Sequence, residues 1–193
     1  MGTSSLRRRA QLLAARPDLA VVDLRGNVPT RLRKVAEGQC DAAILAGAGL
    51  LRLSLDDRIA GWLDAPAWLP APGQGAIAIE SRADDPDGGP LLAALADAPT
   101  MLATAAERAL LATLEGGCHV PVGALVAAEH GGLVLHGLVA DPDGGRVVRG
   151  SEPVDRAAPA RAGERLARSL LAGGAAEILE RVRHTPHPVV SAP

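Results

Sequence analysis

The sequence predicts an α/β unit followed by an α+β unit within one chain of 193 residues. In the first third, short apolar runs alternate with helical patterns, which is the order in which parallel strands and their covering helices occur. In the last half, three strand patterns separated by Gly-rich turns lie between helical patterns. This second arrangement predicts a small three-stranded antiparallel sheet covered by helices.

The composition describes a globular chain with an aliphatic core. Hydrophobic residues make up 48% of the chain and charged residues 22%, with no Phe or Tyr and two Trp. With only two aromatic side chains to stack on bases, we expect no nucleic-acid binding. No apolar run approaches the roughly 20 residues that span a bilayer, so we expect a cytoplasmic protein with no membrane partner. Cys40 and Cys118 offer neither a disulfide framework nor metal-ligand spacing, so no metal is expected.

Positive charge is concentrated at the start of the chain. Residues 1–34 hold seven arginines and Lys34 against two aspartates, although the whole chain has a formal net charge of −2. Guanidinium groups pair bidentately with carboxylates and phosphates, so this bias permits an oxyanion site. A coding bias that replaces lysine with arginine explains the same composition.

Three turns in the first third each lead into a predicted helix. The turn over residues 2–5 offers hydroxyl N-caps, and such a turn binds anions through free N–H groups and the helix dipole. Ligands of parallel α/β sheets bind at the carboxyl ends of the strands, so we expect the turns to form one site. The predicted elements are helices over 6–15, 28–37 and 50–55 and strands over 18–24 and 40–45.

The rest of the chain contains a proline-rich connection and then the second unit. Two turns rich in Gly, one at 130–132 and one at 141–145, separate the strand patterns of the antiparallel sheet. The Pro/His-rich tail from His184 is expected to be disordered. The predicted elements are helices over 58–63, 90–96, 100–114, 159–171 and 175–183 and strands over 76–80, 122–128, 133–140 and 146–152.

One cysteine lies on a predicted tight loop after the 100–114 helix. Gly116 and Gly117 end the helical pattern, and Pro121 closes the turn after Cys118. Glycine permits backbone angles that other residues avoid, and proline cannot continue a helix. A thiol held on such a loop is placed to carry a group, although a loop cysteine taken alone is more often an unremarkable thiol. Cys40 begins a predicted strand and is expected in the core.

Six motifs, in order along the chain, resemble one known family, the porphobilinogen deaminases or hydroxymethylbilane synthases. The similarity runs from residue 2 to about residue 183, and six co-linear motifs are too many for chance agreement. The motifs are Gly-Thr-Ser-Ser-Leu-Arg-Arg at 2–8, Leu-Arg-Gly-Asn-Val at 24–28, Thr-Arg-Leu at 30–32, Pro-Gly-Gln-Gly-Ala at 72–76, Ala-Glu-Arg-Ala at 106–109 and Leu-Glu-Gly-Gly-Cys-His-Val-Pro-Val-Gly at 114–123.

The resemblance implies a transferase of haem and other tetrapyrrole biosynthesis. The family condenses four porphobilinogen molecules head to tail, with loss of ammonia, into hydroxymethylbilane. The reaction is primed by a dipyrromethane cofactor, and Cys118 matches the cysteine that carries it. Arginines suit the acetate and propionate groups of the pyrroles. The positions that match cofactor- or substrate-binding residues are Ser5, Arg7, Arg8, Arg25, Arg31, Ala46 and Arg52.

The resemblance also implies a domain organisation. Residues 1–72 resemble a periplasmic-binding-protein-like second domain that lacks its first strand, and residues 73–94 resemble the crossing strand and linker. Residues 95–183 resemble the carboxyl-terminal domain with its attachment loop, and residues 184–193 are the tail. The family works as a monomer, with porphobilinogen and the growing pyrrole chain as its ligands.

No residue in the sequence matches the family's catalytic aspartate, which belongs to an amino-terminal domain. We therefore expect the chain to be the carboxyl-terminal part of such an enzyme, from a truncated or split gene, and to be inactive alone. In the case of a split gene, a separate amino-terminal domain is an expected partner. The alternative is a non-catalytic anion-binding lobe that uses the basic turns and makes no use of Cys118.

Overall fold

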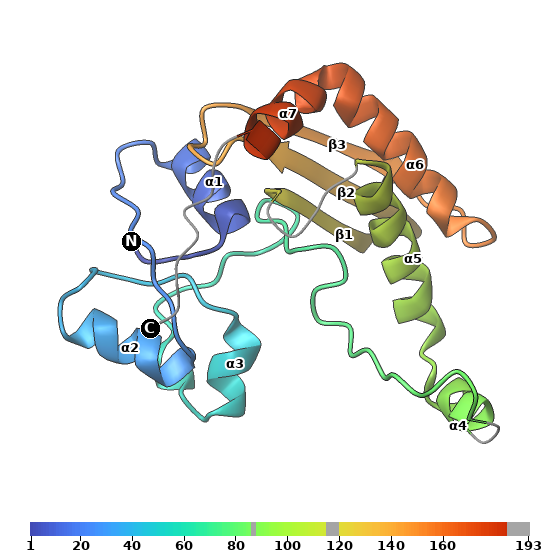
Figure 1. Ribbon diagram of the computed structural model, residues 1–193, viewed down its shortest axis with the longest axis horizontal. Helices are drawn as coiled ribbons and strands as arrows, with labels where there is room; N and C mark the ends of the chain where they lie inside the picture. Colours follow the sequence, from blue (N-terminus) through green and yellow to red (C-terminus); the bar gives the residue numbers. More distant parts are fainter. Residues whose placement is uncertain (86–87, 115–119, 185–193) are drawn as a thin grey trace.

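The computed structural model describes residues 1–85, 88–114 and 120–184. Three helices near the amino terminus lie to one side of a three-stranded antiparallel sheet, and a long crossing segment joins the two parts (Figure 1). The prediction of an α/β unit followed by a sheet with covering helices is confirmed at this level. The predicted disordered tail lies outside the described residues except for His184, which ends the last helix.

The first part consists of three short parallel segments and the helices that follow them. Gly2 forms parallel bridges with both Val22 and Ala43, so the first segment lies between the other two. The predicted strands over 18–24 and 40–45 are reduced in this structure to these single bridges with Gly2. The helices are α1 (Leu6–Ala15), α2 (Val28–Ala36) and α3 (Gly47–Arg52).

Two helix predictions in this part are wrong in position or kind. The helix predicted over 50–55 begins three residues earlier, at Gly47, directly after the third parallel segment. The helix predicted over 58–63 is only the 3₁₀ turn η1 (Asp56–Arg58). The chain beyond that turn runs without helix, and the ring of Trp62 lies against Gly47, where an added Cβ would come within 2.2 Å of the ring.

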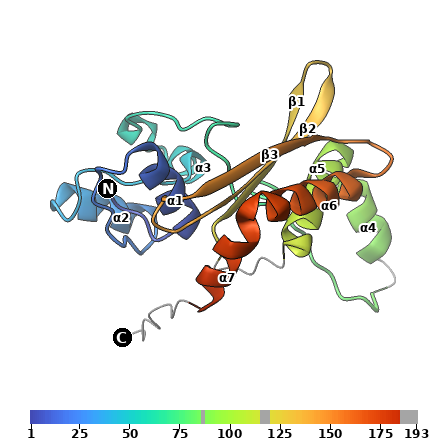
Figure 2. The ribbon, with the colours of Figure 1, turned by 90° about the horizontal axis from the view of Figure 1, so that it is seen from above.

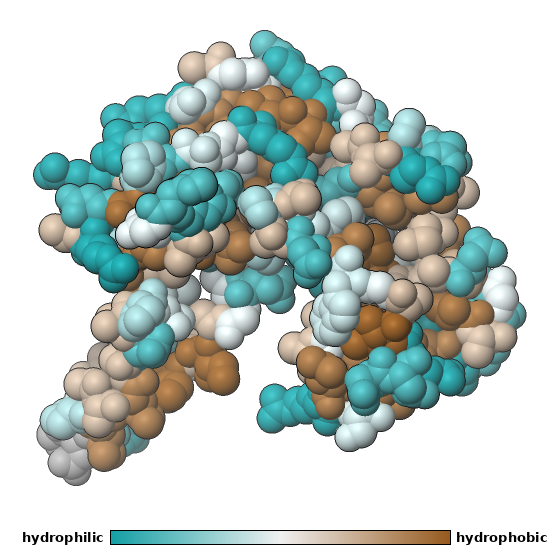
Figure 3. Space-filling view, turned by 180° about the vertical axis from the view of Figure 1, so that it is seen from behind, coloured by the Kyte–Doolittle hydropathy of each residue, from teal (hydrophilic) through white to brown (hydrophobic). Residues whose placement is uncertain are grey.

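The crossing segment carries one buried anchor and one exposed stretch. Leu69 is fully buried, whereas Ile77 is 88% exposed and Ile79 is 55% exposed. The strand predicted over 76–80 is wrong in this structure, because an extended segment becomes a strand only when it pairs, and these residues lie outside the sheet. Helix α4 (Gly88–Leu95) follows, and Figure 3 shows hydrophobic surface along this projecting arm, where Leu91 and Leu95 are exposed.

The sheet is an antiparallel meander in the order β1-β2-β3, as the sequence predicts. Helices α5 and α6 run along one face of it, and α7 follows α6 at one end (Figure 2). A π-helical turn, η2 (Leu171–Ala175), joins the last two helices. The elements are α5 (Ala98–Thr113), β1 (Val122–Glu129), β2 (Gly132–Ala140), β3 (Val147–Pro153), α6 (Pro159–Leu170) and α7 (Ala176–His184).

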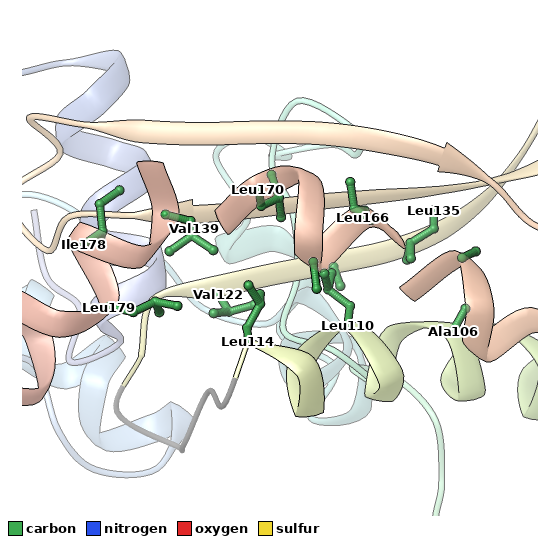
Figure 4. Packing of buried hydrophobic residues seen from close by; sticks show 14 of the residues in the cluster. Ala106, Leu110, Leu114, Val122, Leu135, Val139, Leu166, Leu170, Ile178 and Leu179 are labelled. Atoms are coloured by element: carbon green, nitrogen blue, oxygen red, sulfur yellow. The ribbon is translucent and has the colours of Figure 1, made fainter. Parts of the chain in front are cut away.

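The main core fills the space between the sheet and its helices. Leu110, Leu135 and Leu166, from α5, β2 and α6, meet there with almost no exposure (Figure 4). Helices α5 and α6 approach closely at Gly163, where a Cβ would lie 2.2 Å from the carbonyl oxygen of Ala106. The close approach of the two helices requires glycine at this position.

The opposite face of the sheet receives α1 and the buried anchor of the crossing segment. Ala10, Leu69, Leu138 and Ala140 form a second, smaller apolar cluster there. Side chains alternate along β2, so Leu138 faces this cluster while its neighbours face the main core. The α/β part is therefore attached to the sheet through α1. No helix within the described ranges is long and apolar enough to cross a membrane.

Candidate functional site

The three amino-terminal helices begin at the same edge of the three parallel segments. Gly2 N–H donates to the Ala42 oxygen at 2.7 Å, and Thr3 N–H donates to the Val22 oxygen at 3.0 Å. Because the segments are parallel, the chain leaves all three at one edge, and α1, α2 and α3 start there. The first turn of each helix presents N–H groups with no partner in its own helix, which favours anions at this edge.

The hydroxyl-rich turn before α1 is held by its own side chains. The Ser5 side chain caps α1 by accepting the Arg8 N–H at 3.4 Å. Ser4 Oγ donates to the Leu24 oxygen at 3.1 Å, and Thr3 Oγ1 accepts the Ser5 N–H at 3.2 Å. The turn is thereby fixed to the neighbouring segment, and Ser5 lies at the start of the helix, as the sequence predicts.

Arg8 and Arg31 place two positive charges near each other at this edge. Arg8 Nη1 donates to the Ile44 oxygen at 3.0 Å, and Arg31 Nε donates to the Gly26 oxygen at 2.7 Å. Burial lowers the pKa of Arg8, and the charge of Arg31 lowers it further. Neither guanidinium forms an ion pair with a carboxylate of the described residues. Two partly buried cations without an anionic partner form a site whose electrostatics favour a bound anion.

The other predicted residues at this edge are more exposed. Arg25 forms an exposed ion pair with Asp23 at 2.8 Å, so its guanidinium is partly neutralised. Ala46 precedes α3 and has no side-chain cap, and Arg52 lies on the exposed surface in the last turn of the same helix. Arg25 and Ala46 precede α2 and α3, whereas Arg52 lies at the far end of α3, and none of the three is joined to the Arg8–Arg31 pair by a hydrogen bond among the described residues.

Arg7 points to a different place from its neighbour Arg8. Its Nη1 donates to the Leu69 oxygen at 2.6 Å, and its Nη2 donates to Gln74 Oε1 at 3.5 Å. Burial lowers the pKa of Arg7 to about 10, with the charge of Arg8 as the second cause. At neutral pH Arg7 is therefore still charged. In this structure it contacts the crossing segment, whereas the sequence resemblance implies a role in binding carboxylates of the cofactor or substrate.

Two buried polar residues near this junction were missed from the sequence. Glu107, on α5, is 5% exposed and accepts the Gly73 N–H at 2.6 Å and the Val126 N–H at 2.9 Å. Burial raises its pKa, although the two N–H bonds act in the opposite direction. Gln11, on α1, binds the backbone of Leu69. Both are polar residues on an otherwise apolar helical face, and this pattern in the sequence could have indicated that they are buried.

Cys118, the predicted attachment residue, lies outside the described residues. The chain on either side of residues 115–119 is anchored in the core. Leu114 is buried at the end of α5, and Val122 is buried at the start of β1 (Figure 4). The other cysteine, Cys40, is buried, as predicted. No group of three or more His, Cys, Asp or Glu in the described part of the chain is arranged to hold a metal ion.

The fold and the site together define a class of protein. Its members have an α/β unit with basic residues at the helix starts, joined to a unit with a three-stranded sheet. The profile described as "Porphobilinogen deaminase, dipyromethane cofactor binding domain" matches residues 1–88. The profile described as "Porphobilinogen deaminase, C-terminal domain" matches residues 101–172. The chain belongs to the porphobilinogen deaminase family.

Curated relatives with the name porphobilinogen deaminase are similar along nearly the whole chain. The protein of Desulforudis audaxviator is 55% identical over 185 residues, which is 95% of this chain and 59% of that relative. The protein of Acidithiobacillus ferrooxidans is 53% identical over 188 residues, with 95% and 60% covered. The protein of Xanthomonas oryzae pv. oryzae is 51% identical over 179 residues, with 93% and 59% covered. The chain thus spans about three fifths of the length of these relatives.

Proposed function

We propose that this chain carries a dipyrromethane cofactor on Cys118 and contributes that site to hydroxymethylbilane synthesis. In that reaction four porphobilinogen molecules are joined head to tail with loss of ammonia. The observation that supports the proposal best is the Arg8–Arg31 pair, which is partly buried, adjacent to helix starts and without a carboxylate partner among the described residues. The family described for residues 1–88 is a dipyrromethane-binding one.

The chemistry of the residues fits a pyrrole chain that bears acetate and propionate groups. Guanidinium groups bind carboxylates with charge-assisted, often bidentate hydrogen bonds. Arg8 and Arg31 would bind the carboxylates at the helix starts, with Ser5, Arg25, Ala46 and Arg52 around them. When bound, the cofactor supplies the pyrrole on which the chain is extended.

Cys118 would form the covalent link. Its thiolate sulfur attacks the methylene carbon of porphobilinogen, a carbon–sulfur bond forms, and the amino group leaves as ammonia with the thiol proton. The thiolate is the reactive form of a cysteine, so the rate of this step depends on the fraction of Cys118 that is ionised. We assign no catalytic aspartate in this chain, and we expect no turnover by the chain alone.

The experiment is to incubate the purified chain with porphobilinogen or with hydroxymethylbilane and measure its intact mass. We expect a mass increment of pyrrole units that disappears in Cys118→Ala and persists in Cys40→Ala, because Cys40 is buried. We expect Arg8→Gln combined with Arg31→Gln to slow adduct formation. Absence of the increment in the unmodified chain, with anion binding retained, would favour a non-catalytic anion-binding lobe. Robust tetrapyrrole formation would contradict the expected inactivity.

The remaining expectations about organisation and partners belong to the same proposal. We propose the division into residues 1–72, 73–94, 95–183 and 184–193, with the first unit resembling a periplasmic-binding-protein lobe. A monomer located in the cytoplasm, with porphobilinogen as its ligand and an amino-terminal domain as a further partner, stays a prediction. Sedimentation of the purified chain tests the oligomeric state directly.

A further inference from the structure

A small pocket lies on the face of the sheet that is turned away from α5 and α6. Its volume is about 220 Å³, and its lining comes from β2, β3 and the crossing segment. Typical ligand pockets have volumes of about 300–1,000 Å³, so an occupant of this pocket must be small. Arg8 and Arg31 do not line it, so the pocket is separate from the site at the helix starts.

The pairing of β2 with β3 forms the floor of the pocket. Three successive residue pairs lie there: His136 with Ser151, Gly137 with Gly150, and Leu138 with Arg149. Side chains alternate along a strand, so the two outer pairs face one side of the sheet and the glycine pair faces the other. A Cβ on either glycine would point at Leu166, in the main core. The floor is therefore bare backbone between the two outer pairs.

The crossing segment closes one side of the pocket. Pro66 and Leu69 line it, and Leu69 belongs to the same apolar cluster as Leu138. Arg149 fixes the segment in place, because its Nη2 donates to the Ala67 oxygen at 3.0 Å and its Nη1 donates to the Pro66 oxygen at 3.5 Å. This wall of the pocket is thus apolar, whereas the strands supply polar groups on the other side.

Arg149 is a cation without an anionic partner. It forms no ion pair with a carboxylate of the described residues. Three of its five N–H groups donate to oxygens of Pro66, Ala67 and Gln11, which leaves two for a ligand. Partial burial lowers the pKa of Arg149, and the guanidinium stays charged at neutral pH. A partly desolvated cation with free donors favours a bound anion.

Two side chains beside Arg149 restrict the kind of anion. Ser151 is exposed, and its hydroxyl has no hydrogen-bond partner among the described residues, so it can donate to a ligand. His136 Nε2 lies 2.8 Å from Glu129 Oε1, and this contact holds the imidazole ring beside the pocket. The nearby Glu129 carboxylate repels a ligand of high negative charge. The pocket therefore suits a ligand with one negative charge and a small apolar group.

We propose that this pocket binds a short-chain monocarboxylate. The carboxylate accepts hydrogen bonds from Arg149 and Ser151, and the alkyl chain lies against Pro66 and Leu69. A ligand in this position touches both the sheet and the crossing segment, so its binding stabilises the attachment between them. The inference goes beyond the proposed function, because it requires neither Cys118 nor the residues at the helix starts.

The test is a titration of the whole chain with sodium butyrate, at constant ionic strength, followed by backbone amide NMR shifts. We expect saturating shifts at Gly137, Gly150 and Ser151 with a Kd in the millimolar range, since a ligand of few atoms binds weakly. Butyramide, the neutral isostere, should give no saturating shifts there. Sulfate should bind about tenfold more weakly, because it has no apolar chain to bury. Equal binding of butyramide or of sulfate would overturn the proposal.

Two substitutions assign the binding to its residues. Ser151→Ala removes a hydrogen bond to the charged group of the ligand and should raise the Kd for butyrate about tenfold. Arg149→Gln removes the charge and should abolish the saturating shifts. Arg168→Gln removes an exposed arginine that is paired with Glu164 on α6, and this matched control should leave the Kd unchanged. An unchanged Kd in Ser151→Ala, at an exposed position that tolerates the change, would overturn the proposal even if Arg149→Gln fails to fold.

A titration of Arg31→Gln separates the pocket from the helix starts. Butyrate is an anion, so it can also bind near Arg31. We expect the shifts at Gly137 and Gly150 to saturate with the same Kd in Arg31→Gln as in the unmodified chain. Saturating shifts confined to Thr3 and Ser5, or lost everywhere in Arg31→Gln, would place the ligand at the helix starts and overturn the proposal.

Discussion

The side chain of Gln11 pairs with both backbone polar groups of Leu69. Its Nε2 donates to the Leu69 oxygen at 3.0 Å, and its Oε1 accepts the Leu69 N–H at 2.8 Å. Gln11 is 3% exposed and Leu69 is fully buried. An irregular segment can be buried only if its backbone groups find partners, so this pair lets the crossing segment lie between α1 and the sheet.

Replacing Gln11 with Leu should destabilise the chain strongly. The substitution leaves the Leu69 N–H without its partner. The Leu69 oxygen then accepts a hydrogen bond only from the Arg7 guanidinium. An unsatisfied buried group costs on the order of 1–3 kcal/mol, so we expect a loss of about 3 kcal/mol in the free energy of unfolding. Urea denaturation measures it. Gln39→Leu, on the exposed surface, is the control and should change stability by less than about 0.5 kcal/mol.

Glu107 should make stability depend on pH in the acidic range. Its pKa is raised in the folded chain, so the folded state holds the proton more tightly than the unfolded state. The cost of ionising Glu107 is fully present above the folded pKa. It is relieved as the pH falls through that pKa toward the unfolded value, about 4.3. This group alone therefore contributes stability that rises as the pH falls.

The measurement compares the free energy of unfolding with pH for the unmodified chain and for Glu107→Gln. We expect the difference between them to shift in favour of the unmodified chain as the pH falls from 7 toward 5. Glu164→Gln, which removes an exposed carboxylate on α6, is the control. A difference that is constant over this range would show that Glu107 titrates at its ordinary pKa.

Arg31 should influence both its neighbour and the binding of anions. Removing its charge in Arg31→Gln relieves the repulsion that lowers the pKa of Arg8, and should raise stability by about 0.5 kcal/mol at low ionic strength without anions. The same substitution should reduce the rise in melting temperature that citrate produces at constant ionic strength. Arg33→Gln, whose charge is paired with Glu37, is the control. An unchanged citrate effect in Arg31→Gln would exclude Arg31 from the anion site.

Gly163→Ala should separate α5 from α6. The added Cβ would lie 2.2 Å from the Ala106 oxygen and 2.6 Å from the Leu110 nitrogen, and both are backbone atoms that cannot rotate away. Overpacking of this kind costs on the order of 1–3 kcal/mol, and backbone clashes belong at the upper end. Thermal unfolding should show a large fall in melting temperature. Gly61→Ala, where a Cβ meets no atom within 4 Å, should show little change.

The regular elements of the sheet unit could be predicted because each carries its own local pattern. The strands alternate, the hairpin turns contain glycines, and the long helices repeat apolar residues at helical spacing. The segment over 76–80 carries the same strand pattern and yet forms no strand, because pairing depends on a partner that local sequence does not specify. The parallel segments around Val22 and Ala43 were shortened for the same reason.

Helix periodicity explains much of the candidate site and shows what was overlooked. Successive residues of a helix point about 100° apart, so Arg7 and Arg8 face different surroundings although they are adjacent. Arg7 shares a face with Ala10 and Gln11, which are buried against the crossing segment, and this spacing foretells its burial. The partners of Gln11 and Glu107 could not be predicted, because they are backbone groups of residues far along the chain.

Ile77 and Ile79 form an exposed apolar stretch that favours self-association of the chain. They are two residues apart in a stretch without regular secondary structure, and both are largely exposed. A stretch of that kind adds readily to the edge of a sheet in another molecule. We therefore expect this stretch to lower the concentration at which the purified chain stays in solution. Light scattering should show that Ile77→Lys begins to self-associate at a higher concentration than the unmodified chain. The melting temperature should be the same for both.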